Sequence, residues 1–400
     1  MDQTRAEIIA NKMNEISESP LVGDDLINYI VDKVQRERPE YSRNYIINLM
    51  ICITQGFLTV FSGPPGCGKT SICEIIANTL GLSDFGNVQI EDEEVHLSRF
   101  VPVSVERGWV GKEDFIGYYS PLTNSYEKKN KELFDCIEVI DWEKKHENEI
   151  KIYPYVVMLD EANLSPMEYY WAAFIRACDD IHTHYCIDLG GKNSFLIPNH
   201  LRFVATINND HTTEMLSPRL IDRAWIISLP DGTESNNNSI ERDSENDDNP
   251  ESTEANNNGK AQDSDDDKPI SWNRMIETFS VPDEAIELPK KYFEIKQAFR
   301  DLDIHISHRA EKSIRNYYAI ATKLMNDDEG TNSKKEDIAL DYAILQRVLP
   351  FIFGVGGQYE KELKDITIMI ENRDLKETTE KLYRIIDRAE RRTKVYQFFG

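Results

Sequence analysis

The sequence GPPGCGKT, from Gly63 to Thr70, directly follows a predicted strand and directly precedes a predicted helix. This is the Walker A pattern in the strand–loop–helix context that it requires. The glycines let the main chain curl until its N–H groups face a phosphate, and the start of the helix adds partial positive charge. Lys69 would reach the β- and γ-phosphates, and the Thr70 hydroxyl would bind Mg²⁺. The residues expected to contact the nucleotide are Gly63, Pro64, Pro65, Gly66, Cys67, Gly68, Lys69, Thr70 and Ser71.

Short β-rich runs alternate with helical stretches before residue 230, which predicts a parallel sheet. Beyond residue 268, apolar residues recur at spacings of three and four, which predicts helices. We therefore expect an α/β fold in which a P-loop core with a five-stranded parallel sheet is followed by a mostly helical lid. The predicted strands are Phe57–Ser62, Arg99–Val105, Tyr155–Leu159, Arg202–Ile207 and Trp225–Leu229.

Composition divides the chain into four regions. Residues 1–40 are a helical segment, 41–230 the α/β core, 231–268 an acidic insertion, and 269–400 the helical lid. The insertion holds 13 acids and 3 bases and almost no apolar residues. Such a segment cannot bury enough apolar surface to offset the entropy of ordering, so we predict that it is disordered.

The chain carries 71 acidic and 46 basic residues, a formal net charge of −25. Proteins that hold DNA mainly through its phosphates need a basic surface, so strong intrinsic DNA binding is not expected. The sequence has no apolar run long enough to span a membrane, and its N-terminus lacks the pattern of a signal peptide. The six cysteines have no CxxC spacing. We expect a cytoplasmic protein with reduced thiols.

The sequence VVMLDEANLSP ends an apolar run on two acids, Asp160 and Glu161. Burying a carboxylate is costly unless a partner or a metal ion compensates it. Taken by themselves, the two acids could equally be solvated residues at a strand end. With a P-loop in the chain, we expect their strand beside the P-loop strand. Asp160 would then hold Mg²⁺ through water, and Glu161 would orient and polarise the attacking water.

Phosphoryl transfer also needs a polar group that positions water and an arginine for the developing charge. The sequence LRFVATINND ends a predicted strand on Asn208, followed by Asn209. Farther on, SPRLIDRA places Arg219 and Arg223 four residues apart, on one face of a predicted short helix. Surface ion pairing is the alternative for both arginines.

The sequence DIHTHYC places His182 and His184 on one face of a predicted strand, together with Cys186. These are conceivable metal ligands. Two histidines at this spacing without a matched carboxylate are more typical of a hairpin surface. The sequence YCIDLGGKNSFLIP predicts a hairpin that turns at Gly190 and Gly191. We expect no metal site there.

The motifs together resemble the McrB-like group of AAA+ ATPases, the motor subunits of modification-dependent restriction systems and their relatives. The resemblance covers about residues 45–230 and 300–365. It also includes Ile116, Gly117, Tyr118 and Tyr119 after the aromatic residue Trp109. The stretches that carry it are GPPGCGKT, LDEANLSPMEYYWAAF, ATINND with LSPRLIDRA, VPVSVERGWVGKEDFIGYYSPL and LQRVLPFIFGVGGQYEKEL.

The resemblance implies a homo-oligomeric ring, a hexamer, with nucleotide sites at subunit interfaces. Asn208 would lie on the strand between the two Walker strands as sensor 1. Arg223 would be the arginine finger that reaches the neighbouring subunit, with Arg219 as its support or substitute. Arg309, which follows the predicted N-cap Ser307, would be the sensor-2 arginine.

The resemblance further implies a small McrC-like partner that stimulates hydrolysis and carries or recruits a nuclease, in antiviral defence. Residues 1–40 are too short to replace the DNA-recognition domain of the restriction motor. ATP is favoured because most AAA+ proteins use it, and GTP stays open because the best-known McrB-like member uses GTP. Two alternatives remain. One is a MoxR-like chaperone that remodels proteins. The other is a nucleotide-gated assembly switch, against which Glu161 argues because a switch needs no base.

Overall fold

The chain is described here by a computed structural model. The predicted acidic insertion lies outside the described residues except for Lys268, and so do His182 and His184. The structure describes residues 4–178, 185–191, 194–209, 213–229, 268–282, 286–328, 330, 333–391 and 394–399.

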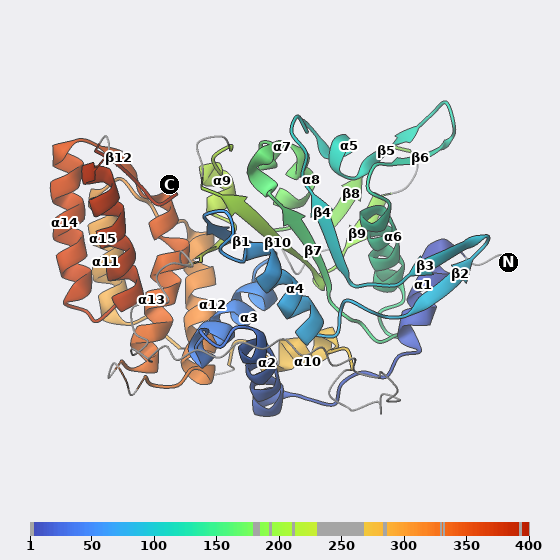
Figure 1. Cartoon of the computed structure of the whole chain (residues 1–400), viewed down its shortest axis with the longest axis horizontal. Coiled ribbons are helices and arrows are strands. Elements are labelled where there is room, and N and C mark those ends of the chain that lie inside the picture. Colours follow the sequence, from blue (N-terminus) through green and yellow to red (C-terminus); the bar gives the residue numbers. More distant parts are fainter. Residues whose placement is uncertain are drawn as a thin grey trace, which may run out of the picture.

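A five-stranded sheet lies at the centre of the α/β part of the molecule (Figure 1). All neighbouring strands are parallel. The predicted α/β fold with a five-stranded parallel sheet is therefore confirmed, and the observed strands differ from the predicted ones only at their ends. In spatial order the strands are β11 (Trp225–Ser228), β1 (Leu58–Gly63), β10 (Leu201–Asn208), β7 (Tyr155–Asp160) and β4 (Phe100–Ser104).

The strand order corrects one expectation and confirms another. β7, which ends at Asp160, does not lie beside the P-loop strand β1, because β10 pairs with both. The strand that ends at Asn208 does lie between the two, as predicted. Gly63 pairs with Asn208 in the register of β1 and β10. Because the strands are parallel, the carboxyl ends of β1, β10 and β7 meet at one edge of the sheet, where α/β proteins bind ligands.

Two helices connect the sheet to the rest of the fold. α4 (Lys69–Thr79) contacts β1, β10 and β7, and α3 (Arg43–Gln55) contacts β1 and β10. α3 is buried without interruption from residue 46 to residue 54, because it also packs against α12 of the helical part. Its buried Asn48 Oδ1 accepts hydrogen bonds from Tyr317 Oη (2.6 Å) and Gln346 Nε2 (3.0 Å). Core and lid therefore share one hydrogen-bonded interface.

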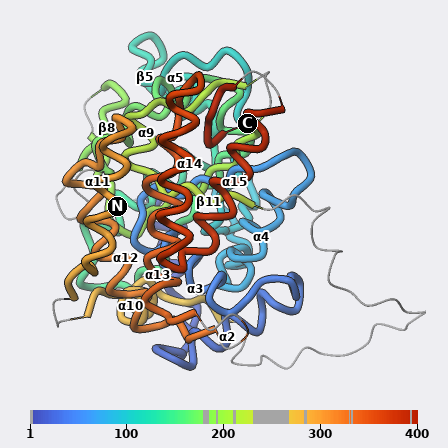
Figure 2. The backbone as a smooth tube through the Cα atoms, turned by 90° about the vertical axis from the view of Figure 1, so that its left-hand side faces the viewer, coloured from blue at the N-terminus to red at the C-terminus, as the bar shows by residue number. Residues whose placement is uncertain are grey.

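The helical part of the chain contains five longer helices that lie side by side (Figures 1 and 2). The predicted helix after Ser307 is confirmed, and the Ser307 hydroxyl caps it by accepting from Ala310 N at 3.1 Å. The last residues of the lid are not helical, because Lys394 has φ +55° and Val395–Gln397 form β13. β13 pairs with β12 (Phe353–Val355). The helices are α11 (Lys290–Asp301), α12 (His308–Leu324), α13 (Lys335–Arg347), α14 (Gly357–Glu371) and α15 (Lys376–Arg391).

The N-terminal region forms two helices, α1 (Arg5–Asn14) and α2 (Gly23–Glu37). α10 (Trp272–Thr278) packs against α2 rather than joining the five lid helices. The residues before α10 also bind the α/β part, since Ile270 N donates to Leu80 O at 3.0 Å. None of the helices in the described ranges is long and apolar enough to cross a membrane.

Three antiparallel hairpins extend from the α/β part. They are β2–β3 (Asn87–Ile90 and Glu93–His96), β5–β6 (Gly117–Ser120 and Ser125–Lys128) and β8–β9 (Tyr185–Asp188 and Ser194–Ile197). The last confirms the hairpin predicted to turn at Gly190 and Gly191, whose φ values are +86° and +79°. The remaining elements are α5 (Lys112–Phe115), α6 (Lys131–Lys145), α7 (Met167–Tyr170), α8 (Ala172–Ile175), α9 (Pro218–Ile221) and the 3-10 turns η1 (Ala162–Leu164) and η3 (Leu349–Phe351).

Candidate active site

The loop between β1 and α4 curls around the side chain of Lys69. Lys69 is the first residue of α4, and its Nζ donates to the main-chain carbonyl oxygens of Gly63 (2.9 Å) and Pro64 (2.8 Å). Gly68 caps the helix with φ +87°, a conformation that favours glycine. The ammonium group is therefore held within the loop, at the N-terminus of α4. Such an arrangement suits a phosphate group.

The Asp160 carboxylate lies at the end of β7, within hydrogen-bond distance of two hydroxyls. Thr70 Oγ1 donates to Asp160 Oδ1 at 2.9 Å, and Thr206 Oγ1 donates to the same oxygen at 2.7 Å. A threonine hydroxyl and a carboxylate supply the hard oxygen ligands that Mg²⁺ prefers. The structure therefore brings the two predicted magnesium ligands together, and their donor chemistry fits the ion.

Glu161 has a main-chain conformation that is rare for a residue with a side chain. Its φ and ψ are 53° and 44°, in the left-handed region. Its N–H donates to Thr206 Oγ1 at 2.8 Å, and its Oε1 accepts from Asn208 Nδ2 at 3.3 Å. Strained conformations of this kind persist where the surroundings fix them, often at functional sites. The turn directs the Glu161 carboxylate to the predicted sensor residue.

Two polar residues that hold this constellation together were missed by the sequence analysis. Thr206 links Asp160 to the main chain of Glu161, as described above. Asn163 holds the end of β10, because its Nδ2 donates to Asn208 O at 2.9 Å and its Oδ1 accepts from Asn208 N at 3.2 Å. A signal for Thr206 was present, since residues 206 and 208 point to the same face of a strand.

We expect Thr206→Val to slow hydrolysis by about 10- to 100-fold, because a hydrogen bond to a charged group contributes about 1.5–3 kcal/mol. Valine has nearly the same shape, so the buried site stays filled while the hydroxyl is lost. The measurement is steady-state phosphate release, with Thr206→Ser as the control that keeps the hydroxyl. Equal rates for the valine and serine variants would show that Thr206 does not orient the acids.

Arg38 is a third residue that the sequence did not indicate. It follows α2, and its Nη2 donates to Ser71 Oγ at 2.9 Å. The same nitrogen lies 2.7 Å from where a Cβ on Gly68 would be, so a side chain at Gly68 would displace it. Arg38 adds positive charge beside the P-loop from a residue far away in the sequence. The first 40 residues therefore contribute to the wall of this site.

Of the three predicted arginines, Arg309 binds Asp222, which is the C-cap of α9. Arg219 and Arg223 do not share a helix as expected, because α9 ends at Ile221. Arg223 lies in the following turn, and its Nη1 donates to Arg219 O at 3.0 Å. Arg309 Nη1 donates to Asp222 Oδ2 at 2.8 Å, and Ser307 Oγ donates to Asp222 Oδ1 at 2.5 Å. The contacts found for Arg309 thus join the lid to the turn that carries Arg223.

A cavity of about 310 Å³ adjoins the sensor end of this site. Its walls include Asn163, Asn208 and Met215 from the α/β part and Gln397 and Phe399 from the end of the lid. The lid therefore reaches the edge of the sheet at which the catalytic candidates lie.

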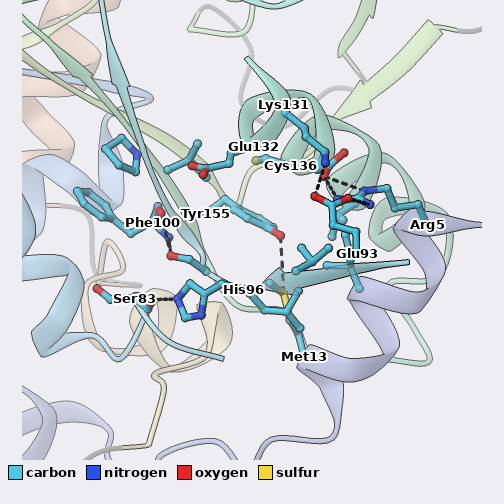
Figure 3. Close-up of a pocket in the computed structure, with 18 of the residues that line it drawn as sticks. Arg5, Met13, Ser83, Glu93, His96, Phe100, Lys131, Glu132, Cys136 and Tyr155 are labelled. Atoms are coloured by element: carbon cyan, nitrogen blue, oxygen red, sulfur yellow. Dashed lines mark hydrogen bonds and ion pairs between the residues drawn. The ribbon is translucent and has the colours of Figure 1, made fainter. Parts of the chain in front are cut away.

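A larger cavity of about 540 Å³ lies elsewhere, among α1, the β2–β3 hairpin, β4 and α6. Figure 3 shows charged groups gathered on one side of it, where Arg5 and Lys131 pair with Glu93 and Arg5 also binds Asp135 at 2.8 Å. These charges compensate one another, and the walls contain none of the predicted site residues. We therefore assign the candidate chemistry to the residues around the P-loop and Asp160, whose sensor end the smaller cavity adjoins.

The described residues contain no cluster of three or more His, Cys, Asp or Glu side chains arranged to hold a metal ion. Cys186 is an exposed thiol in β8. His182 and His184, which we considered with Cys186 as conceivable metal ligands, lie outside the described residues. The expected absence of a metal site there therefore stays a prediction.

Two protein-family models match parts of the chain. Residues 59–164 match the model of the ATPase family associated with various cellular activities (AAA), and residues 273–394 match a domain of unknown function (DUF8727). The first match extends from β1 to η1, so it includes the P-loop, Asp160 and Glu161 but ends before Asn208 and the arginines. No curated protein matches the sequence.

Proposed function

Because residues 59–164 form an AAA-type ATPase domain, we propose that this chain is a nucleoside triphosphatase that works as a ring motor. One observation carries the proposal: a continuous hydrogen-bonded chain at the carboxyl ends of β7 and β10 links Thr70, Asp160, Thr206, Glu161 and Asn208. A site that only bound nucleotide would not need a carboxylate held in this position.

The residues divide the work of hydrolysis as follows. The P-loop N–H groups and Lys69 bind the phosphates. To do so, the Lys69 ammonium group gives up its hydrogen bonds to the carbonyl oxygens of Gly63 and Pro64. Thr70 and Asp160 would hold Mg²⁺, which when bound would neutralise negative charge on the phosphates. Glu161 accepts a proton from the attacking water, and Asn208 orients that carboxylate. Arg223 of one subunit stabilises the developing charge at the site of its neighbour.

We propose ATP as the favoured substrate, with GTP as the alternative. The ring would be a homo-oligomer, a hexamer, and would power a separate McrC-like or nuclease effector in a cytoplasmic defence system of the McrB-like kind. The resemblance of the hairpin segment after Trp109 and of the lid supports this assignment. The acidic net charge argues against strong DNA binding by the chain itself.

A MoxR-like chaperone that remodels proteins is the second candidate function. The chemistry would be identical, and the net charge of −25 mildly favours a protein substrate over DNA. Copurification of a basic nuclease-like protein would support the first candidate, whereas ATP-dependent remodelling of a protein in its absence would support the second. A nucleotide-gated switch with negligible turnover is disfavoured by the placement of Glu161.

The first experiment is phosphate release from ATP and from GTP over a range of protein concentrations. We expect the rate per subunit to rise steeply with concentration, because each site is completed by the neighbouring subunit's Arg223. Lys69→Ala, which lacks the phosphate-binding ammonium, is the control for contaminating phosphatases. A measurable rate that does not change with concentration would show self-sufficient subunits and rule out the ring.

A further inference from the structure

Arg347, the last residue of α13 in the lid, reaches the turn that carries Arg223. Its Nη2 donates to the main-chain oxygen of Asp222 at 2.8 Å, and its Nη1 donates to that of Ala224. These two carbonyls lie immediately before and immediately after Arg223. One lid side chain therefore holds the main chain on both sides of the predicted arginine finger.

The contact is unusual because the Arg347 side chain is only 1% exposed. Removing a guanidinium from water costs several kcal/mol unless other groups compensate it. Burial lowers the pKa of Arg347 to about 10, so the side chain is still charged at neutral pH. The two carbonyls, the nearby negative charge of Asp222 and the ring of Trp225, whose centroid is 5.2 Å from the guanidinium, supply the compensation.

The finger segment needs such support, because α9 has only four residues. A single helical turn is marginal by itself and takes its stability from tertiary contacts. The lid supplies further contacts through Ser307 and Arg309, which bind the Asp222 carboxylate, as described above. Arg347 differs from these two, because it holds the main chain around Arg223 rather than a side chain next to it.

We propose that Arg347 is a positioning residue for Arg223, so that the lid of each subunit sets hydrolysis at the neighbouring subunit's site. This inference rests on the proposed function, in which Arg223 acts across a subunit interface. Arg347 touches neither nucleotide nor water in this role. Arg347 fixes the position of the main chain at Arg223. A misplacement of a catalytic group by about 1 Å can slow a reaction by about 10²-fold.

Arg202 provides a matched control within the same chain. It is 2% exposed, donates to main-chain carbonyls of Thr54 (2.8 Å) and Leu201 (2.9 Å), and lies 4.5 Å from the ring centroid of Trp272. Its burial, partners and aromatic contact thus parallel those of Arg347. It lies at the start of β10, whereas the catalytic candidates lie at the end of that strand.

The test compares Arg347→Met and Arg202→Met, after both have been checked for folding by thermal unfolding. Arg347→Met should bind nucleotide as tightly as the wild type but release phosphate about 10²-fold more slowly. Mixing it with an excess of Lys69→Ala subunits, which keep an intact finger, should restore hydrolysis at the Arg347→Met P-loops. Mixing Arg347→Met with Arg223→Ala subunits should not restore hydrolysis, because neither variant supplies a correctly placed finger. Arg202→Met should lose stability but keep its turnover.

Wild-type turnover by Arg347→Met would overturn the positioning role. The positioning role would also be wrong if Lys69→Ala subunits restored hydrolysis by Arg223→Ala but not by Arg347→Met. It would be wrong as well if Arg202→Met lost hydrolysis and regained it with Lys69→Ala subunits in the same way as Arg347→Met. If Lys69→Ala subunits restore neither variant, the finger does not act across an interface, and the proposed ring mechanism is wrong as well. Should Arg347→Met not fold, Arg347→Lys takes its place, since lysine keeps the charge but lacks the fork that binds two carbonyls.

Discussion

Replacement of Glu161 by glutamine is expected to stop turnover while leaving nucleotide binding within a few-fold of wild type. The amide can still accept a hydrogen bond from Asn208 Nδ2, so the turn keeps its contact. It cannot accept a proton from water, and general-base catalysis contributes about 10²–10⁴-fold in rate. Single-turnover phosphate release and the dissociation constant of a fluorescent ATP analogue measure the two effects separately.

The bound state of Glu161→Gln should also accumulate as an oligomer, because nucleotide that is not hydrolysed keeps the interface closed. Size-exclusion chromatography with light scattering would report the number of subunits and thereby test the hexamer. Glu168→Gln, the same substitution on α7, is the control for nonspecific effects of removing an acid. Normal hydrolysis by Glu161→Gln would place the base elsewhere.

Arg223→Ala is expected to lower the hydrolysis rate by roughly 10³-fold, the scale of an arginine finger, without weakening nucleotide binding much. The reason is that Arg223 would contact the nucleotide of the neighbouring subunit and would stabilise the negative charge that develops only in the transition state. Mixing Arg223→Ala with Lys69→Ala subunits should restore part of the activity, because one supplies the P-loop and the other the finger.

Arg219→Ala separates the two arginines that the sequence could not rank. Arg219 is exposed at α9, and its carbonyl accepts the hydrogen bond from Arg223. Since that carbonyl remains in an alanine variant, we expect a smaller loss for Arg219→Ala than for Arg223→Ala. The reverse order would make Arg219 the finger. Failure of the Arg223→Ala and Lys69→Ala mixture to gain activity would contradict a finger that acts between subunits.

The sequence predicted the sheet and the position of the P-loop between β1 and α4, because both depend on residues that are close together in the chain. Strand periodicity and the Walker A spacing are properties of adjacent residues, so β1, β7 and β10 and the residues at their ends could be recognised in the chain. Asn208 was correctly expected on the strand between the Walker strands. The position of Arg223 within a helix was wrong, because a four-residue spacing resembles a helix even where the helix has already ended at Ile221.

Local sequence therefore determined which residues we propose for the chemistry: a loop shaped for phosphate, and polar side chains at the ends of parallel strands. Tertiary structure alone decided what surrounds and orients them. Arg38 reaches Ser71 across 33 residues of sequence, and Arg347 reaches Ala224 across 123. Arg38 lies in no motif, and the LQRVLP stretch that contains Arg347 does not reveal its partners, because a buried or half-buried arginine is placed by whichever carbonyls and hydroxyls the folded chain presents. Short sequence motifs indicate the candidate site residues. The orientation of these residues depends on the long-range packing of the lid and the N-terminal helices against the sheet.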